Sequence, residues 1–238
     1  GVRAVMAVLV DNNAVEEYEI DQDADGVVAE EPTRTRVIDA QGHRADIRAV
    51  ALSPDDATLI TCSHKGVKVW NPMDGSCLRS IDGGYGLCAA FAPGGRHAVV
   101  GCKSGALEII DTQAGTALGG MKDAHGGAVW GVALLPDGSG FVTASADKTV
   151  KFFEWRLVDV EDDDDDEGEG RRELGIAHVK TLQMAEDVLS VKVTPDGKLL
   201  SVSLLDNTLK VFFVDSLKFF LSLYGHRLPA LCHDVSSD

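Results

Sequence analysis

The chain has 238 residues and a formal net charge of −16, with 45% apolar and 25% charged side chains. This composition indicates a soluble, globular protein that is long enough to bury a sizeable core. An acidic surface repels phosphate groups, so general binding to nucleic acid or to an anionic membrane is disfavoured. Any contact with RNA would need a local basic patch, and the only adjacent pair that suggests one is Arg171-Arg172.

The five cysteines are irregularly spaced and form no CxxC pair. This pattern favours small buried thiols in a reducing compartment over disulfides or a metal site. No signal peptide is visible, and the chain begins at Gly1 rather than at a methionine. We therefore expect it to be a piece of a longer protein.

From residue 4 to residue 20 the chain reads as two strands, "AVMAVLV" and "AVEEYEI", followed by an insertion at residues 21–35. Four similar units come next, marked by the turns "SPDD", "APGG", "LPDG" and "TPDG". Their prolines are 39, 43 and 59 residues apart, and the last gap contains an acidic run. Such a period indicates a repeat architecture.

Each unit is built of short runs in which apolar residues alternate. One strand precedes the turn ("IRAVAL" in the first unit), and a second follows it ("TLITCS"). A third ends in a large apolar residue ("VKVW"), and a fourth closes the unit ("CLRSI"). Four short strands per forty residues are typical of a β-propeller blade.

The predicted fold is therefore all-β, with four full blades and partial blades at both ends. The expected boundaries are 1–41 for the end of a preceding blade with its insertion, 42–83, 84–122, 123–183 and 184–224 for the blades, and 225–238 for the first strand of a further blade. The end pieces could pair and close a five-bladed ring. We favour a fragment of a larger or tandem propeller, because four blades of this size fall short of a seven-bladed ring.

The dipeptides at the unit ends resemble those of the WD-repeat family. "GH" at His43 precedes "WN" at Trp70, "AH" at His125 precedes "FE" at Phe153, and "GH" at His226 opens a further unit. A single such dipeptide would be weak evidence, but here their order repeats in register across most of the chain.

In the third unit, His125, Ser145 and Asp147 form a Ser/His/Asp set that could indicate a hydrolase. They fall in a loop, at a strand end and in a turn, and the sequence has no G-x-S-x-G elbow. In the WD-repeat family this set is structural: the histidine bonds the serine and the aspartate, and the serine bonds a tryptophan, here replaced by Phe153. The resemblance implies structural roles for His43, Ser63, Trp70, His125, Ser145, Asp147, Asp206 and His226.

No enzyme activity, cofactor or metal is expected. The glycine-rich stretches lack the lysine of a phosphate-binding loop, and the seven histidines show no paired metal-ligand spacing. We interpret Trp130 and Trp155 as packing residues.

Two segments are candidate interaction sites. The run "DVEDDDDDEGE" holds nine acids, and we expect the insertion at residues 159–172 to be either a solvated loop or a contact for a basic partner. The predicted outer strand of the last full unit is unusually aromatic, so part of it is expected to be covered by a partner or a neighbouring propeller. The candidate residues are Phe219, Phe220, Tyr224, Asp162, Asp163, Asp164, Asp165 and Asp166.

The wording of the last unit, "SVSLLDNTLKVFFVDSLKFFLSLYGHRLPAL", more closely resembles one group within the WD-repeat family. This group is the WD-repeat protein three family of the eukaryotic small-subunit processome, and the resemblance covers about residues 43–238. It implies a non-catalytic nucleolar scaffold for pre-rRNA processing and 18S rRNA maturation. The implied partners are processome WD-repeat proteins, including the periodic tryptophan protein, and, indirectly, the U3 small nucleolar RNA particle and pre-rRNA, with no membrane or small-molecule substrate. The alternative is a generic propeller adaptor, such as a ubiquitin-ligase substrate receptor or a signalling platform.

Overall fold

The computed structural model describes residues 2–9, 15–22, 33–38, 42–160 and 171–236. Residues 1–44 and 45–238 form two units, which are described separately. The first unit is an antiparallel sheet in the order β1 (Val2–Leu9), β2 (Val15–Gln22) and β3 (Thr33–Ile38). The sequence predicts β1 and β2, but the insertion expected at residues 21–35 overlaps the start of β3. The reason is that β3, with Thr33, Thr35 and Val37 at alternate positions, pairs with β2.

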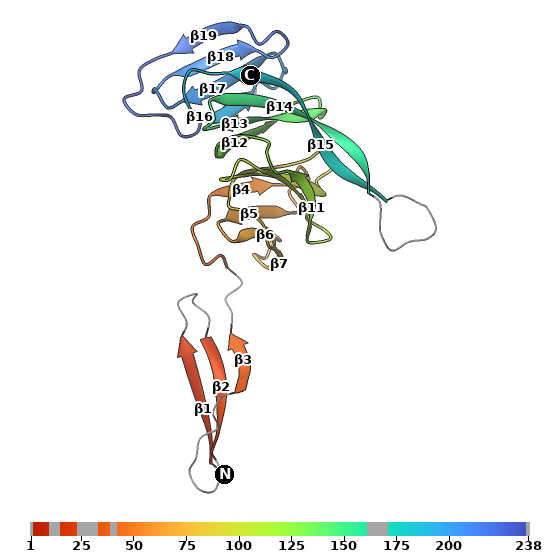
Figure 1. Cartoon of the computed structure of the whole chain (residues 1–238), viewed down its shortest axis with the longest axis vertical. Coiled ribbons are helices and arrows are strands. Elements are labelled where there is room, and N and C mark those ends of the chain that lie inside the picture. Colours follow the sequence, from red (N-terminus) through yellow and green to blue (C-terminus); the bar gives the residue numbers. More distant parts are fainter. Residues whose placement is uncertain (1, 10–14, 23–32, 39–41, 161–170, 237–238) are drawn as a thin grey trace. The chain divides into compact units, whose positions relative to one another are not determined.

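The second unit consists of four antiparallel sheets of four strands each (Figure 1). Within each sheet the strands lie in chain order, which confirms the predicted propeller blades. The strands are β4 (Ala49–Leu52), β5 (Leu59–Ser63), β6 (Gly66–Trp70), β7 (Cys77–Ile81); β8 (Gly86–Phe91), β9 (His97–Cys102), β10 (Leu107–Asp111), β11 (Thr116–Met121); β12 (Val129–Leu134), β13 (Gly140–Ser145), β14 (Thr149–Val160), β15 (Arg171–Gln183); β16 (Val188–Val193), β17 (Leu199–Leu204), β18 (Leu209–Phe213) and β19 (Phe219–Leu223). Within these described ranges, no helix is long and apolar enough to cross a membrane.

The proline turns connect the first and second strands of every blade in the same way. The fourth residue of each turn is left-handed, with φ of 57° at Asp56, 73° at Gly95, 72° at Gly138 and 71° at Gly197. Glycine adopts this conformation without the steric cost of a Cβ, so three of the four turns use it. Side chains add support: the Thr194 hydroxyl donates to Asp196 and accepts from the N–H of Leu199.

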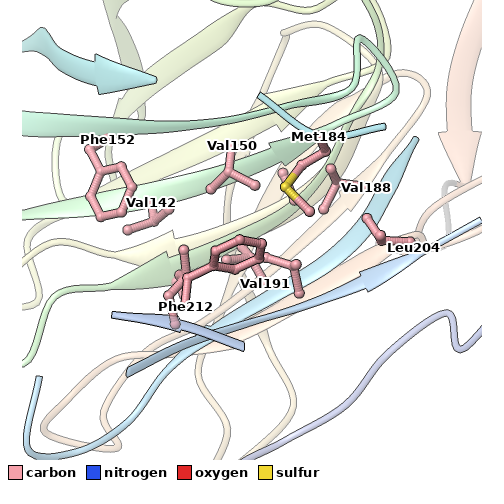
Figure 2. Packing of buried hydrophobic residues seen from close by; sticks show 12 residues of the cluster. Val142, Val150, Phe152, Met184, Val188, Val191, Leu204 and Phe212 are labelled. Atoms are coloured by element: carbon pink, nitrogen blue, oxygen red, sulfur yellow. The ribbon is translucent and has the colours of Figure 1, made fainter. Parts of the chain in front are cut away.

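Successive blades pack face to face through three apolar clusters. The third and fourth blades share the cluster in Figure 2, where Val142, Val150 and Phe152 meet Val191 and Phe212. Similar clusters join the first blade to the second and the second to the third. Each large side chain buried in this way contributes about 1.5–3 kcal/mol, so the interfaces between blades hold most of the core.

Hydrogen bonds also connect each blade to the loop that starts the next one. The N–H of His125 donates to the carbonyl of Gly105, and that of Met184 donates to the carbonyl of Lys148. At the end of the last blade, the Asn207 side chain donates to the carbonyl of Arg227. In all three cases the turn between the second and third strands of one blade binds the chain entering the next position.

The segment after β19 occupies the place of a further first strand but forms none. Residues 225–236 contain no strand, although Nε2 of His233 lies 2.7 Å from the Ser201 hydroxyl and Lys192 pairs with Asp234. The first strand predicted within residues 225–238 is thus absent from the described residues 225–236. It has no second strand here with which to pair, and an isolated strand leaves its backbone groups unsatisfied.

The cysteines largely match the expectation of buried thiols. Cys62, Cys88 and Cys102 are buried, Cys77 is intermediate and Cys232 is exposed. Burial raises the pKa of Cys62 and of Cys102 to about 12, so these thiols stay protonated at neutral pH.

Candidate functional site

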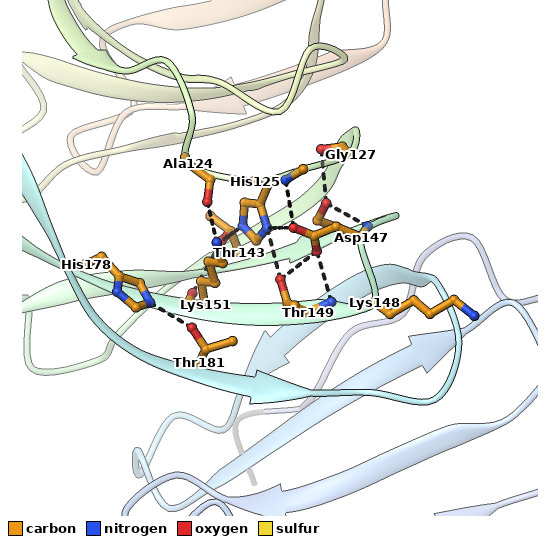
Figure 3. Close-up of polar contacts among 12 residues, drawn as sticks. Ala124, His125, Gly127, Thr143, Asp147, Lys148, Thr149, Lys151, His178 and Thr181 are labelled. Carbon is orange, nitrogen blue, oxygen red and sulfur yellow. Dashed lines mark hydrogen bonds and ion pairs between the residues drawn. The ribbon is translucent and has the colours of Figure 1, made fainter.

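His125 lies at the centre of a hydrogen-bonded network in the third blade (Figure 3). It precedes β12, and its Nδ1 lies 2.9 Å from Oδ2 of Asp147 in the turn between β13 and β14. Its Nε2 lies 2.7 Å from the hydroxyl oxygen of Thr143 on β13. Asp147 also accepts from the N–H groups of Gly126 and Thr149. The network therefore ties together a loop, a strand and a turn.

Much of this network is buried, and its members hydrogen-bond to one another. His125 is only 5% exposed and Thr143 is fully buried. Burial lowers the pKa of His125, although the Asp147 carboxylate opposes that effect. For Asp147, burial raises the pKa, but hydrogen bonds from Thr149, Gly126 and His125 outweigh it and lower the pKa overall. Both ring nitrogens of His125 are engaged by the chain itself, so neither is left to act as a base toward a substrate.

Thr143, rather than Ser145, is the hydroxyl partner of His125. Ser145 instead donates to the carbonyl of Gly127 and accepts from the N–H of Asp147. The expected histidine–serine bond is therefore wrong in detail. Because alternate residues of a strand share a face, the sequence pattern could not separate Thr143 from Ser145.

In the first blade, too, a threonine takes the place of the expected serine as the bonding partner. Nε1 of Trp70 donates to the hydroxyl of Thr61 at 2.7 Å, whereas Ser63 accepts from the N–H of Lys65 in its own turn. In both blades the threonine that makes the bond lies two residues before the predicted serine. Thr61 and Thr143 therefore occupy equivalent positions in their blades.

Phe153 occupies the position that Trp70 has in the first blade. It is fully buried and stacks on Phe141, with 5.3 Å between ring centroids. Trp155 packs against Phe141 at 4.7 Å, as expected for a packing residue. Trp130 differs from that expectation, since it is 43% exposed. It lies at a bulge in β12, which turns the side chain outward.

Asp206 and His226 form no such network in the described part of the second unit. Asp206 is exposed and accepts from the N–H and hydroxyl of Thr208 in its own turn. His226 is exposed in the segment after β19. His43 belongs to the first unit.

The second blade replaces the network with apolar packing. Val100 pairs with Ala89 as Thr143 pairs with Val132, so a valine stands where the first and third blades have threonine. The loop before β8 is held in another way: the carboxylate of Glu108 accepts from the N–H of Gly84. In the third blade Lys151, at the matching strand position, donates to the carbonyl of Ala124. The same strand position thus anchors the loop before the first strand of both blades. The anchoring group is a carboxylate in the second blade and an ammonium group in the third.

The aromatic outer strand β19 is exposed in this chain. The fractional exposure is 55% for Phe219, 48% for Phe220 and 78% for Tyr224. Phe219 meets the buried Phe212 edge to face, while Phe220 contacts the partly exposed Phe213 on the other side of the sheet. Full burial of Phe219 and Phe220 would have excluded an interaction surface on β19. Neither side chain is fully buried.

The acidic candidates Asp162, Asp163, Asp164, Asp165 and Asp166 lie outside the described residues. The structure nevertheless changes the limits of the insertion predicted at residues 159–172. β14 continues to Val160 and β15 begins at Arg171, so a two-stranded ribbon extends beyond the blade (Figure 1). The last pair between β13 and β14 is Gly140 with Glu154, and beyond it β14 pairs with β15 alone. The alternation of Trp155, Leu157, Leu174 and Ile176 was the missed sequence signal.

No metal centre is formed by the described residues, where no group of three or more His, Cys, Asp or Glu side chains could hold an ion.

Comparison with known proteins identifies the family. The model of the WDR3 second β-propeller domain matches residues 46–238. The chain belongs to this family. Human WD repeat-containing protein 3 is 43% identical over 221 residues, which are 93% of this chain and 22% of that protein. The Dictyostelium discoideum homologue is 43% identical over 92% of this chain and 22% of its own length.

A yeast relative carries a different name. U3 small nucleolar RNA-associated protein 12 of Saccharomyces cerevisiae is 39% identical over 226 residues, covering 94% of this chain and 24% of that protein. Yeast periodic tryptophan protein 2 is more distant, at 23% identity over 81% of this chain and 24% of its own length. The chain thus spans about a quarter or less of each of these relatives.

Proposed function

We propose that this chain is a non-catalytic scaffold domain of the small-subunit processome, acting in nucleolar pre-rRNA processing and 18S rRNA maturation. The observation that carries the proposal is the family match over residues 46–238 together with a relative named for its association with U3 small nucleolar RNA. A ribosome-biogenesis role for a WD-repeat protein is the common element of these names. Location in the nucleolus follows from the same role.

The geometry supports a binding role over a chemical one. The best candidate for catalysis is the pair of His125 and Asp147. Their hydrogen bonds are made within the blade, where they hold a loop to a strand. The blades form a rigid framework of apolar interfaces, and such a framework presents strand edges and loops to partners. The exposed aromatic side chains of β19 are one such surface.

The partners we propose are other WD-repeat proteins of the processome, among them the periodic tryptophan protein, and the U3 particle on pre-rRNA. The yeast periodic tryptophan protein 2 is itself a relative of this chain, so both would be propellers. Propellers can pack through exposed outer strands, since each blade ends in one.

Depletion and copurification test the proposal. Depleting the protein that carries this chain should lower 18S rRNA relative to large-subunit rRNA and raise its uncleaved precursor. An affinity-tagged copy should copurify U3 small nucleolar RNA and the periodic tryptophan protein. Copurification with a ubiquitin-ligase core, with normal 18S rRNA after depletion, would instead establish a generic adaptor.

A further inference from the structure

The outer strand of the fourth blade, β19, is the last strand of its sheet and has one open edge (Figure 1). Among the described residues, β18 pairs with one side of β19 and no strand pairs with the other. The described segment after β19 turns back toward β16 and β17, at the opposite side of the sheet, where His233 contacts Ser201. The backbone groups along the outer edge of β19 are therefore open to a partner.

Hydrogen bonds at the end of β18 show which of its residues bond to β19. The N–H of Phe213 donates to the carbonyl of Lys218, just before β19. The N–H of the next residue, Val214, donates to the carbonyl of Lys198, just before β17. Because successive residues of a strand bond to neighbours on opposite sides, the odd-numbered residues of β18 bond to β19 and the even-numbered ones bond to β17.

The register between β18 and β19 then shows which backbone groups of β19 face the open edge. Leu221 lies opposite the odd-numbered Val211, so these two residues exchange backbone hydrogen bonds. Ser222 lies opposite the even-numbered Lys210, which bonds to β17 instead. The N–H and C=O of Ser222 therefore point away from β18, where a strand added along the edge would bond to them.

The other three outer strands carry features that discourage strand addition, whereas β19 does not. β7 has the exposed Arg79 at its centre, and β15 has the charged Lys180. β11 contains Gly119 and Gly120, whose φ values of 127° and 147° interrupt the extended backbone. Residues 219–224 contain no charge, proline or glycine. Since natural sheets protect their free edges with such features, the unprotected edge of β19 indicates a place where another strand binds.

The side chains of β19 indicate what kind of strand fits there. Phe219 is 55% exposed on the face of Phe212, and Phe220 is 48% exposed on the face of Phe213. Side chains that lie opposite each other on neighbouring strands pack together, so the added strand needs apolar side chains on both of its faces. A strand with one polar face would place polar groups beside one of the two rings.

We propose that β19 pairs with a strand of a partner protein, which extends the four-stranded sheet of the fourth blade by one strand. The partner strand is uncharged and apolar on both faces, and its backbone bonds to the outward N–H and C=O of Ser222. Backbone pairing supplies affinity, and the side chains beside Phe219 and Phe220 supply specificity. The inference rests on the proposed function, because it specifies how a protein of the processome contacts this chain.

Copurification on the tagged full-length protein tests this pairing with a proline substitution. Ser222→Pro removes the outward N–H and leaves the bonds between β18 and β19 in place, as edge strands allow. Recovery of at least one processome WD-repeat protein should fall by about tenfold, because a carbonyl of the partner strand loses its donor. The matched control is Ser80→Pro, because Ser80 of β7 lies opposite Lys68 as Ser222 of β19 lies opposite Lys210. The control should leave recovery unchanged.

Two further measurements separate backbone pairing from other effects of the proline. Ser222→Ala keeps the N–H and removes the hydroxyl, so recovery should equal that of the native protein. Hydrogen exchange does not depend on the folding of a variant. In the purified particle, the amides of residues 219–224 should exchange about tenfold more slowly, or slower still, than in the purified full-length protein alone, whereas those of residues 77–81 should not change.

Equal recovery with Ser222→Pro and Ser80→Pro overturns the inference, as does unchanged exchange at residues 219–224. An equal loss with Ser222→Ala would place the contact in the side chain and overturn it as well. A dimer of the purified full-length protein that Ser222→Pro dissociates would show that a second copy, and not a partner, occupies the edge. If U3 RNA still copurifies in any of these cases, the proposed function stands and only the strand pairing fails.

Discussion

The backbone N–H of His125 donates to the carbonyl of Gly105 across the boundary between the second and third blades, at 2.9 Å. Gly105 has φ of 92°, and a Cβ added to it would lie 2.2 Å from the carbonyl oxygen of His125. The bond and the close approach occur at the same point. The two blades are therefore joined where one turn has no side chain.

Gly105→Ala should lower the free energy of unfolding by about 3 kcal/mol or more. Left-handed backbone costs alanine about 1–2 kcal/mol, and relieving the clash with His125 must displace backbone. Gly197→Ala is the matched control, because Gly197 is also left-handed, with φ of 71°, but has open space around its Cβ position. Urea denaturation measures both. Equal losses would show that backbone strain alone, and not the junction, limits stability.

His125→Ala should destabilise the fold by about 2–4 kcal/mol, because it leaves the buried Thr143 and the partly buried Asp147 without their shared partner. The control is His178→Ala, since His178 is exposed and bonds only Thr181 among polar side chains. Binding to processome partners should fall only through unfolding. Loss of binding with an unchanged melting temperature would contradict the structural role of His125.

The same network predicts a pH dependence. Burial lowers the pKa of His125 below its ordinary value of about 6.5, so the folded state binds fewer protons than the unfolded state. The stabilisation from neutral His125 is fully present above that ordinary value and is lost as pH falls below it. Melting temperatures between pH 8 and pH 5 should therefore drop more steeply for the native chain than for His125→Asn. Parallel curves for the two proteins would mean that other groups cause the drop, such as His233, whose pKa burial also lowers.

The blade pattern could be predicted from sequence because strands, turns and the forty-residue period are local signals. Thr194 with Asp196 and the glycine at Gly197 set a turn regardless of distant residues. The ribbon of β14 and β15 was not predicted, because the acidic run dominates the composition of this segment and the alternating apolar residues beside it are few. The acidic composition of the run thus obscured the apolar periodicity on either side of it.

The site was less predictable because its contacts depend on packing. Thr143 and Ser145 share a face, and only the position of the His125 ring decides between them. Residues of the first two blades also meet around Tyr85, and no pattern in one sequence places Arg48, His64 and Lys103 around one ring. Contacts between residues that are far apart in the sequence can be read only from the fold.

The aromatic strand β19 yields the last prediction. Phe220→Ser with Tyr224→Ser should weaken copurification with the periodic tryptophan protein by about tenfold or more, because buried aromatic anchors often contribute 2 kcal/mol or more at an interface. Phe219 is left unchanged, since its ring packs on the buried Phe212 and its loss would disturb the blade. Leu157→Ser with Val158→Ser is the control, because it removes two exposed apolar side chains, 70% and 49% exposed, from the ribbon. The melting temperature should stay within a few degrees for both pairs. An equal loss of binding in the control, or none in the Phe220 pair, would show that β19 is not the surface that the partner covers.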